Sequence, residues 1–328
     1  MRRTGEGAGP SRWLPATLGL LVLIAGRPAE ARPSPPPAEA SEAAPARSFG
    51  DLVGESRFGD AFAEPSTWRP LPLRSFFTEG WDEPWVGAPS GTGGAPRQGW
   101  INALDGVFFR LYFADFTFQA NYHHDGNRYL GSYTIFTPVS RRFQLRFDVP
   151  FLDSTKGGAS NTYHGNFGDF AVTPRFLLSE TRDLTQLATM TIRMPTGKTD
   201  NGNGVAGLLP QYEFWYNFNR GWVVRGGAGL AIPTNNVGAR TAMVANLSIG
   251  QYLTPHDRLP FGDLVWYLGG NVRTPLDRRG PPSTYFSLTP GFRTHLGRDW
   301  YLLGAVEVPL TGPKTFDWSP IVWLMKVY

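Results

Sequence analysis

Two short motifs in the sequence contain residue types that could bind phosphate or a metal ion. Gly197-Lys198-Thr199 matches the end of a phosphate-binding loop, but the full pattern requires glycine where Ile192 stands. Residues 200–204 (DNGNG) are rich in oxygen ligands for Ca²⁺, but they lack the later bidentate glutamate of a helix-loop-helix site. Turn formation explains asparagine and glycine at these positions. The sequence therefore predicts no cofactor and no metal site.

Histidine and serine residues are candidates for metal ligands or catalytic groups. His123, His124 and His164 could together form a metal site on outer loops, although solvated loop residues explain them more simply. Ser132 and His295 fall on strand-like segments far apart in the chain, without an evident third partner. The sequence also lacks a G-x-S-x-G nucleophile motif. We therefore predict that the protein is not an enzyme.

Charged residues that alternate with apolar ones form a larger set, and they would face the interior of a closed sheet. The inferred inward set is Arg142, Arg146, Arg175, Arg193, Arg225, Arg273, Arg293, Asp148, Asp169, Glu213 and Glu307. Asp169 begins a strand and is expected to hydrogen-bond a loop or an inner arginine. The set contains seven basic and four acidic side chains. They either form an ion-pair network that stiffens the wall or make a cationic lining that favours anionic or polar aromatic solutes, and the two roles are compatible.

The elements that would position these charges are strands, because period-two alternation recurs from about residue 105 onward. Residues 142–149 (RFQLRFDV) place apolar side chains on one face and polar ones on the other, and residues 211–218 and 285–293 repeat the pattern. Twelve segments are expected, at 107–122, 128–137, 142–152, 167–178, 184–195, 208–218, 222–233, 239–252, 263–274, 284–296, 300–310 and 316–328. They predict an all-β fold, an antiparallel up-and-down transmembrane β-barrel of about 12 strands.

The connections between these segments alternate between two kinds. One kind is mostly short and often charged, at 138–141, 179–183, 219–221, 254–262 and 297–299. The other is longer and rich in Gly, Asn or Pro, at 123–127, 153–166, 196–207, 234–238, 275–283 and 311–315. Outer-membrane barrels have short periplasmic turns and longer outer loops. An even strand count with both termini periplasmic places all the short turns on one side.

Aromatic residues near the short turns support this orientation. Trp222 and Trp300 each follow a short turn directly and fit an aromatic girdle at the membrane interface. Tyr328 ends a strand-like tail of the kind that the barrel-assembly machinery reads, although Lys326 stands where an apolar residue is expected. In the first strand, Arg110 would face lipid if the alternation continued back to it. We therefore expect either a bulge near Ala114 and Asp115 or a barrel that starts later.

The N-terminus has the three parts of a secretory signal peptide, residues 1–31. Three arginines are followed by an apolar run at 14–26 and by a small-x-small site at 29–31. The run of about 13 residues is shorter than the ~20 that a spanning helix needs. Removing residues 1–31 takes away four Arg and two Glu, so the formal charge falls from +4 to +2. A nearly neutral chain gives no reason to expect a nucleic-acid partner.

Two further segments precede the barrel. Residues 32–47 are rich in Pro, Ala and Glu and read as a disordered spacer. Residues 48–104 hold five Trp and Phe residues within 68–85, as in SFFTEGWDEPW, and have no clean period. This extension could be loosely ordered in the periplasm, fold against the barrel, or enter the lumen as a plug. Cysteine is absent, so no disulfide stabilises any of these parts.

Three stretches resemble one family: FGDFAVTPRFLL (167–178), IRMPTGKTDNGNG (192–204) and the strand pair at 208–235. Their order is similar to the outer-membrane family named for the MetA pathway of phenol degradation. The shared features are a Gly-Asp strand start, a Pro-Thr-Gly strand exit, and a strand pair joined by a short turn before Trp. The resemblance covers residues 105–328. It implies an outer-membrane barrel that passes small organic molecules, and it supplies no catalytic residues.

The sequence thus predicts an outer-membrane barrel, residues 105–328, of a double-membraned bacterium. Its expected function is a narrow channel or uptake porin for small anionic or aromatic solutes. The alternative is a non-transporting structural or surface-binding barrel plugged by its N-terminal extension. The expected partners are outer-membrane lipid, the barrel-assembly machinery and small solutes, with no nucleic acid.

Overall fold

The computed structural model describes residues 48–59, 68–157, 162–197, 204–218, 220–235, 238–277, 283–312 and 314–328. The chain divides into two compact units, residues 1–45 and 46–328, and all of the described residues belong to the second. The expected signal peptide, the Pro-rich spacer and most of the run 200–204 therefore lie outside the described residues.

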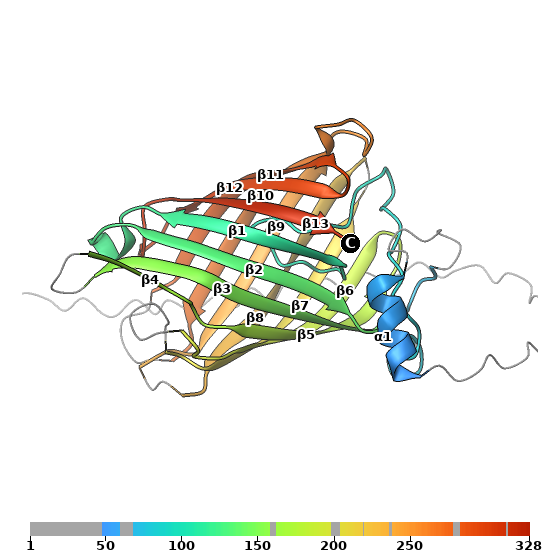
Figure 1. Ribbon diagram of the computed structural model, residues 1–328, viewed down its shortest axis with the longest axis horizontal. Helices are drawn as coiled ribbons and strands as arrows, with labels where there is room; N and C mark the ends of the chain where they lie inside the picture. Colours follow the sequence, from blue (N-terminus) through green and yellow to red (C-terminus); the bar gives the residue numbers. More distant parts are fainter. Residues whose placement is uncertain are drawn as a thin grey trace, which may run out of the picture. The chain divides into compact units, whose positions relative to one another are not determined.

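The described part of the chain is mostly antiparallel strands (Figure 1). The strands are β1 Leu111–Gln119, β2 Arg128–Pro138, β3 Phe143–Gly157, β4 Thr162–Asn166, β5 Ala171–Glu180, β6 Leu184–Arg193, β7 Gly207–Asn217, β8 Trp222–Pro233, β9 Ala242–Tyr252, β10 Gly262–Pro275, β11 Tyr285–Gly297, β12 Trp300–Pro309 and β13 Ser319–Val327. The helical elements are α1 Phe49–Phe58 and the single turns η1 Leu73–Ser75 and η2 Tyr122–His124. No described helix is long and apolar enough to cross a membrane.

Twelve of these strands close into one ring. Each ring strand pairs antiparallel with its neighbours along the chain, and β1 closes the ring on β13 with Leu111 opposite Val327 and Thr117 opposite Ile321. β4 stands outside the ring, because it pairs only with the far end of β3. The prediction of a 12-stranded up-and-down barrel is confirmed.

The expectation that residues 153–166 form a loop is wrong in part. β3 continues to Gly157, and Asp153 to Gly157 pair with β4 beyond the point where β5 leaves β3. An ion pair fixes this extension to β2, since a guanidinium nitrogen of Arg128 lies 2.5 Å from the carboxylate of Asp153. Both side chains are largely shielded from solvent, and the paired residues of β3 and β4 continue the wall beyond the ring.

The first strand begins later than residue 107. β1 starts at Leu111, and its pairing with β2 and β13 runs without a shift through Ala114 and Asp115. The expectation of a bulge at that point is therefore wrong, and the alternative, a barrel that starts later, is confirmed. Arg110 precedes the strand, is 5% exposed, and donates a hydrogen bond to the Tyr328 carbonyl oxygen.

The outer wall is apolar and the inner wall is polar, as the alternation predicts. On β9, for example, Met243, Leu247 and Ile249 are exposed on the outside, whereas Asn246 and Ser248 are buried inside. Leu247 is 60% exposed, which is costly for a side chain facing water. An outer surface made of such side chains fits a hydrocarbon environment.

The two ends of the barrel differ. The five turns that join β2–β3, β5–β6, β7–β8, β9–β10 and β11–β12 lie at one end, here called the short-turn end, and the longer connections lie at the other, the long-loop end. The chain's last residue and α1 lie at the short-turn end, on the right in Figure 1. Near the short-turn end, the outer face of the wall carries aromatic contacts. They include Trp222 with Trp266 at 5.5 Å and Trp300 with Tyr112 at 6.3 Å between ring centroids.

Lys326 fits this arrangement although its residue type is unexpected. Its ammonium group donates a hydrogen bond to the Arg298 carbonyl and lies 3.4 Å from a carboxylate oxygen of Asp299. The charge therefore reaches the turn between β11 and β12 instead of remaining on the apolar wall.

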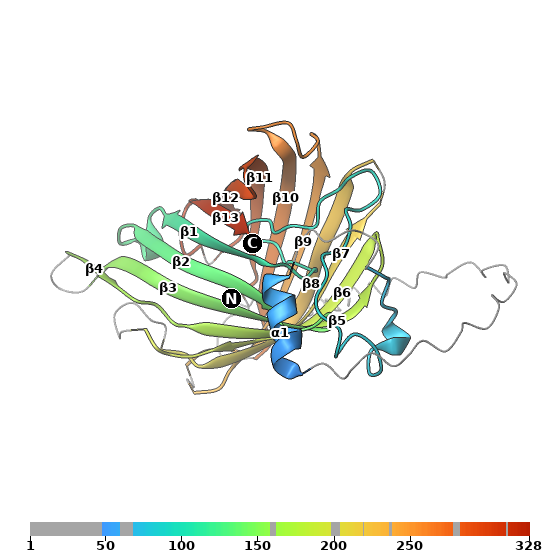
Figure 2. The same ribbon diagram turned by 45° about the vertical axis from the view of Figure 1, so that its right-hand side comes forward.

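The main apolar core lies inside the ring and is shared with residues that precede β1. Trp100, Ile101, Val107 and Phe109 are buried against side chains of the inner wall, which include Trp215, Tyr267, Tyr301, Leu303 and Met325. The segment before β1 can be followed into the ring in Figure 2. Of the three placements left open for residues 48–104, the described part from about residue 85 occupies the lumen.

Candidate functional site: a plug held by the inner wall

The candidate site is the contact between the inner wall and residues 68–110, which we call the plug. Apart from η1 the plug has no regular secondary structure, so its backbone N–H and C=O groups need partners from elsewhere. Inward side chains of the wall supply many of those partners.

The tip of the plug, at Trp100 and Ile101, packs against β10. The Trp100 and Tyr267 rings stack with centroids 5.0 Å apart and planes at 3°, and the Tyr267 hydroxyl accepts a hydrogen bond from the Ile101 N–H at 2.9 Å. Gly250 on neighbouring β9 makes room for this stack, because a Cβ there would lie 2.7 Å from the Trp100 ring. The tip is thus fixed by ring stacking and by a backbone hydrogen bond together.

Arg225 of β8 makes the most concentrated contact with the plug backbone. Its guanidinium donates to the carbonyl oxygens of Leu104 at 2.8 Å, Gln98 at 2.5 Å and Asp105. The side chain is fully buried, and its charge also lies 3.3 Å from the Asp105 carboxylate and over the Trp100 ring. A planar group with five N–H donors is suited to gathering several carbonyls at once.

A second buried cluster lies on β5 and β7. Arg175 donates to the Val107 carbonyl at 2.9 Å, and its guanidinium lies 3.4 Å from the Glu213 carboxylate. Glu213 in turn accepts a hydrogen bond from the Gly106 N–H at 3.1 Å. Gly106 has a φ of +64°, and a Cβ there would come within 2.4 Å of the Phe214 backbone. The plug therefore passes so close to β7 that only glycine fits.

The same cluster includes Asp105 and Gln144. Asp105 lies within 3.9 Å of guanidinium nitrogens of Arg146, Arg175 and Arg225. Gln144 on β3 donates to the Phe109 carbonyl and accepts from Arg175. A carboxylate of the plug is thus neutralised by the wall, as a buried charge requires.

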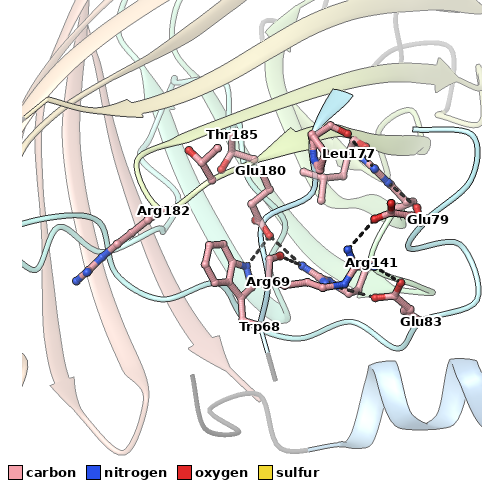
Figure 3. Close-up of polar contacts among 12 residues, drawn as sticks. Trp68, Arg69, Glu79, Glu83, Arg141, Leu177, Glu180, Arg182 and Thr185 are labelled. Carbon is pink, nitrogen blue, oxygen red and sulfur yellow. Dashed lines mark hydrogen bonds and ion pairs between the residues drawn. The ribbon is translucent and has the colours of Figure 1, made fainter. Parts of the chain in front are cut away.

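Where the chain reaches the barrel, Glu180 and Arg141 hold it at the short-turn rim (Figure 3). Glu180 accepts from the Trp68 indole N–H at 2.9 Å, and its backbone exchanges two hydrogen bonds with Leu71. Arg141 donates to the Arg69 carbonyl at 2.5 Å, and Arg69 forms ion pairs with Glu79 and Glu83 of the plug. The backbone hydrogen bonds between Glu180 and Leu71 thus join the end of β5 to the plug.

Plug residues also bind the turn between β5 and β6. Arg97 is stacked over Trp215 at 4.7 Å and donates to the carbonyls of Thr181 and Arg182. Burial lowers the pKa of Arg97, and the carboxylates of Glu180 and Asp183 oppose this decrease.

Asp183, in the same turn, binds the plug through its carboxylate. Its carboxylate accepts hydrogen bonds from the Thr92 N–H at 2.7 Å, from the Thr92 hydroxyl at 2.7 Å and from the Asn217 amide at 2.8 Å. Burial alone would raise the pKa of Asp183, but these bonds and the charge of Arg182 bring its pKa below the ordinary value. The turn therefore holds the plug through an ionised carboxylate.

Cavities flank the plug at both ends. At the long-loop side, a cavity of about 240 Å³ is lined by Asn102, Asp105, Phe113, Arg146, Asn246, Asn271 and Trp323, among others. At the short-turn side, a cavity of about 360 Å³ is lined by Trp85, Arg97, Phe109, Arg110, Asp263 and Tyr301, among others. Plug residues 105–109 lie between these two cavities.

Six of the eleven predicted inward residues contact the plug, and the other five have different surroundings. Arg142, Arg146, Arg175, Glu213, Arg225 and Glu307 all contact plug residues, and Glu307 does so by accepting from the Asn102 amide at 2.8 Å. Arg293 is fully buried beside Asp263 and Tyr301. Asp148 pairs with Arg146 at 2.8 Å. Arg193 and Arg273 are exposed toward the long-loop end. Asp169 accepts a hydrogen bond from the Gly197 N–H of a long loop.

The structure does not assemble the metal and catalytic candidates. Ser132 donates to Asp115 on β1, whereas His295 on β11 stacks on His256 at 4.2 Å, and β1, β13 and β12 lie between their strands. His124 contacts Asn121, and His164 contacts Thr162. Among the described residues, no group of three His, Cys, Asp or Glu side chains could hold a metal ion.

Several plug-binding residues were not predicted from the sequence. Gln144, Asn246 and Tyr267 are uncharged, so a set of inward charges does not include them, although the alternation places all three inside. Asn246 donates to the Asn102 carbonyl at 2.9 Å and accepts from the Leu104 N–H at 3.2 Å. Asp105 and Arg97 lie in a stretch without periodicity, where no sequence signal could assign their partners.

Comparison with known proteins agrees with this architecture. The family profile described as "Putative MetA-pathway of phenol degradation" matches residues 98–295, which is more than half of the chain. The chain belongs to this family, and the predicted resemblance is confirmed. None of the curated proteins matches the chain.

Solved structures extend the comparison to the fold. The crystal structure of an outer membrane channel from Pseudomonas putida F1 is similar, with a TM-score of 0.53 and 14% identity. The alignment covers 70% of this chain and 99% of that chain. At this level of identity, the likeness establishes a shared fold.

The first prediction concerns Arg225. Replacing Arg225 with Gln leaves buried carbonyls of the plug without donors, at about 1–3 kcal/mol each. With a cost of about 3 kcal/mol, an Ile101→Cys reporter, at a fully buried position of the plug, should react about a hundredfold faster with a water-soluble thiol reagent. Arg273→Gln is the matched control, because Arg273 faces the long-loop end, and it should leave the rate unchanged. Equal rates in the two variants would show that Arg225 does not hold the plug.

The second prediction concerns Asp183 and pH. Because its pKa is lowered in the folded protein, its contribution to stability is complete above its unfolded pKa of about 3.9 and is lost as the pH falls through the lowered value. The urea midpoint of the wild type should therefore exceed that of Asp183→Asn at pH 7, and the difference should shrink below about pH 4. A difference that stays constant down to pH 3 would contradict this role.

Proposed function

We propose that this protein is an outer-membrane channel for small solutes that is held closed by its own N-terminal plug. The observation that supports this most directly is the combination of an apolar outer wall with a lumen closed by a non-helical, hydrogen-bonded segment. A purely structural barrel would have no need for a lumen that is then filled by a segment of the same chain. Twelve strands leave a narrow interior, which a single segment can fill.

The proposed location follows from the same features. The apolar wall and its aromatic girdle fit a bilayer, and the signal peptide expected at residues 1–31 would direct export. Under this proposal the short-turn end faces the periplasm, and the long loops face outward. β13 would then carry the signal that the barrel-assembly machinery recognises.

The proposed solutes are small polar molecules, with a preference for those that have a flat aromatic face. In the long-loop cavity, the ring of Trp323 is stacked on Phe113 at 4.1 Å, and an amide nitrogen of Asn271 is buried without a hydrogen-bond partner. An aromatic platform beside amide donors can bind a ring and its polar substituents together.

The preference for anions that the inward arginines suggested is not part of this proposal. Arg142, Arg175 and Arg225 donate to backbone carbonyls, and so their donors are used within the chain. Nearer the long loops, Arg146 is paired with Asp148, and Arg128 with Asp153. Two of the basic side chains near the long loops are thus neutralised by carboxylates, whereas Arg193 and Arg273 are exposed there.

A second candidate is a barrel that does not transport and uses the plug as a permanent core. The number of wall side chains that bind the plug favours it, since each bond must be broken to open the lumen. In neither case do we propose catalysis.

The third prediction separates the two candidates by single-channel recording in planar bilayers. The intact chain should give rare, small currents, and Arg225→Gln should give more frequent openings because it weakens plug binding. A variant without residues 48–104 should give larger currents still. If all three are silent while their folding is shown by a mobility shift on boiling, the non-transporting barrel is the better account.

A further inference from the structure

Residues 72–81 leave the lumen and curl over the rim at the ends of β3 and β5. Leu71 is fully buried inside with Phe108, Leu177 and Leu187, whereas the ring of Trp81 lies 6.3 Å from Phe176 on the outer wall. Phe176 is outward because its neighbour Arg175 is buried in the lumen. The helical turn η1 lies beyond the ends of β5 and β6 in Figure 2. We call residues 72–81 the rim hook.

Arg142 fixes the rim hook to the barrel. Its guanidinium donates to the Leu177 carbonyl of β5 at 2.9 Å on one side. On the other side it donates to the Glu79 carbonyl at 2.9 Å and to the Ser75 hydroxyl at 3.0 Å. The same group lies over the Phe76 ring. The arginine is fully buried, so the hook is attached at a defined position and does not hang freely.

Aromatic side chains connect the hook to the outer surface. Phe76 packs edge-on against Trp81 at 5.4 Å, and the Trp81 indole donates to the Phe76 carbonyl at 2.5 Å. Trp81 then approaches Phe176, which stacks on the outward Phe143 at 5.3 Å. The hook thus adds to the apolar wall at the level where the barrel ends.

The exposed residues of the hook match a phospholipid interface. Phe77 is 88% exposed and Leu73 is 59% exposed, although burying such a side chain is worth about 1.5–3 kcal/mol. Arg74, also exposed, lies between them in the sequence. Apolar side chains beside a basic one are the combination that binds acyl chains and lipid phosphate together.

We propose that the rim hook is a membrane anchor for the plug, with Phe77 and Leu73 inserted in the phospholipid leaflet at the short-turn end and Arg74 at its phosphates. The inference rests on the proposed membrane location and adds a lipid contact outside the barrel wall. The continuity of the hook with the lipid-facing wall favours lipid over a second copy of the chain or another protein. The plug would then be tied to both the lumen and the bilayer.

Single-cysteine labelling tests this in the full chain, because the sequence contains no cysteine. Phe77→Cys, Leu247→Cys and Ser90→Cys are each labelled with a bimane dye and reconstituted in phosphatidylethanolamine/phosphatidylglycerol vesicles, with and without nitroxide-labelled lipids. Leu247 is on the outer wall, whereas Ser90 is a solvent-exposed residue of the plug that lines the short-turn cavity. The nitroxide lipids should quench the dye at residues 77 and 247 to similar extents and leave residue 90 bright.

The outcomes separate the anchor from the channel proposal. Quenching at 247 without quenching at 77 would overturn the anchor and leave the membrane barrel intact. Bright dyes at both positions would instead contradict the membrane location itself. Quenching at 77 that appears only when a second, nitroxide-labelled copy is added would assign the hook to an interface between copies and overturn lipid as the occupant.

Discussion

The structure depends on one constraint: a backbone without regular secondary structure that is buried in a barrel lumen must find hydrogen-bond partners on the wall. Strands of the ring satisfy one another, so the wall offers mainly side chains, and backbone pairing with the plug is found at the rim, between Glu180 and Leu71. Arg225, Arg175 and Asn246 meet this requirement by binding plug carbonyls, and Tyr267 and Glu213 accept from plug N–H groups. These hydrogen bonds between wall and plug account for the position of the plug, the types of inward residues and the closed lumen.

The same constraint changes what the inward charge means. An arginine that faces a water-filled lumen would attract anions, whereas one that gathers several carbonyls has few donors left for a solute. Arg142 illustrates this at the rim, where it joins β5 to the hook. The charged lining is therefore mainly a means of holding the chain, and the polar space available to a solute lies beyond the plug tip.

The strands were predictable because their alternation records which face meets lipid and which meets the lumen. Most boundaries fall within a few residues of the predicted ones, and the twelve-strand count follows from the same pattern. The β4 hairpin was missed because residues 153–166 are rich in Gly, Ser, Thr and Asn, residue types that are also typical of loops. The path of the plug was left open because many of its contacts are made through backbone atoms, which leave little trace in residue type. Gly106 shows this well, since its need for glycine becomes clear only beside Phe214.

Amide hydrogen exchange of the plug in reconstituted protein tests this account most directly. The amides of Ile101, Leu104 and Gly106 donate to Tyr267, Asn246 and Glu213 of the wall. We predict that these three exchange far more slowly than amides of an unstructured chain, although they belong to no helix or strand. Exchange at the unstructured rate in a folded barrel would show that the wall does not hold the plug, and the central claim would fail.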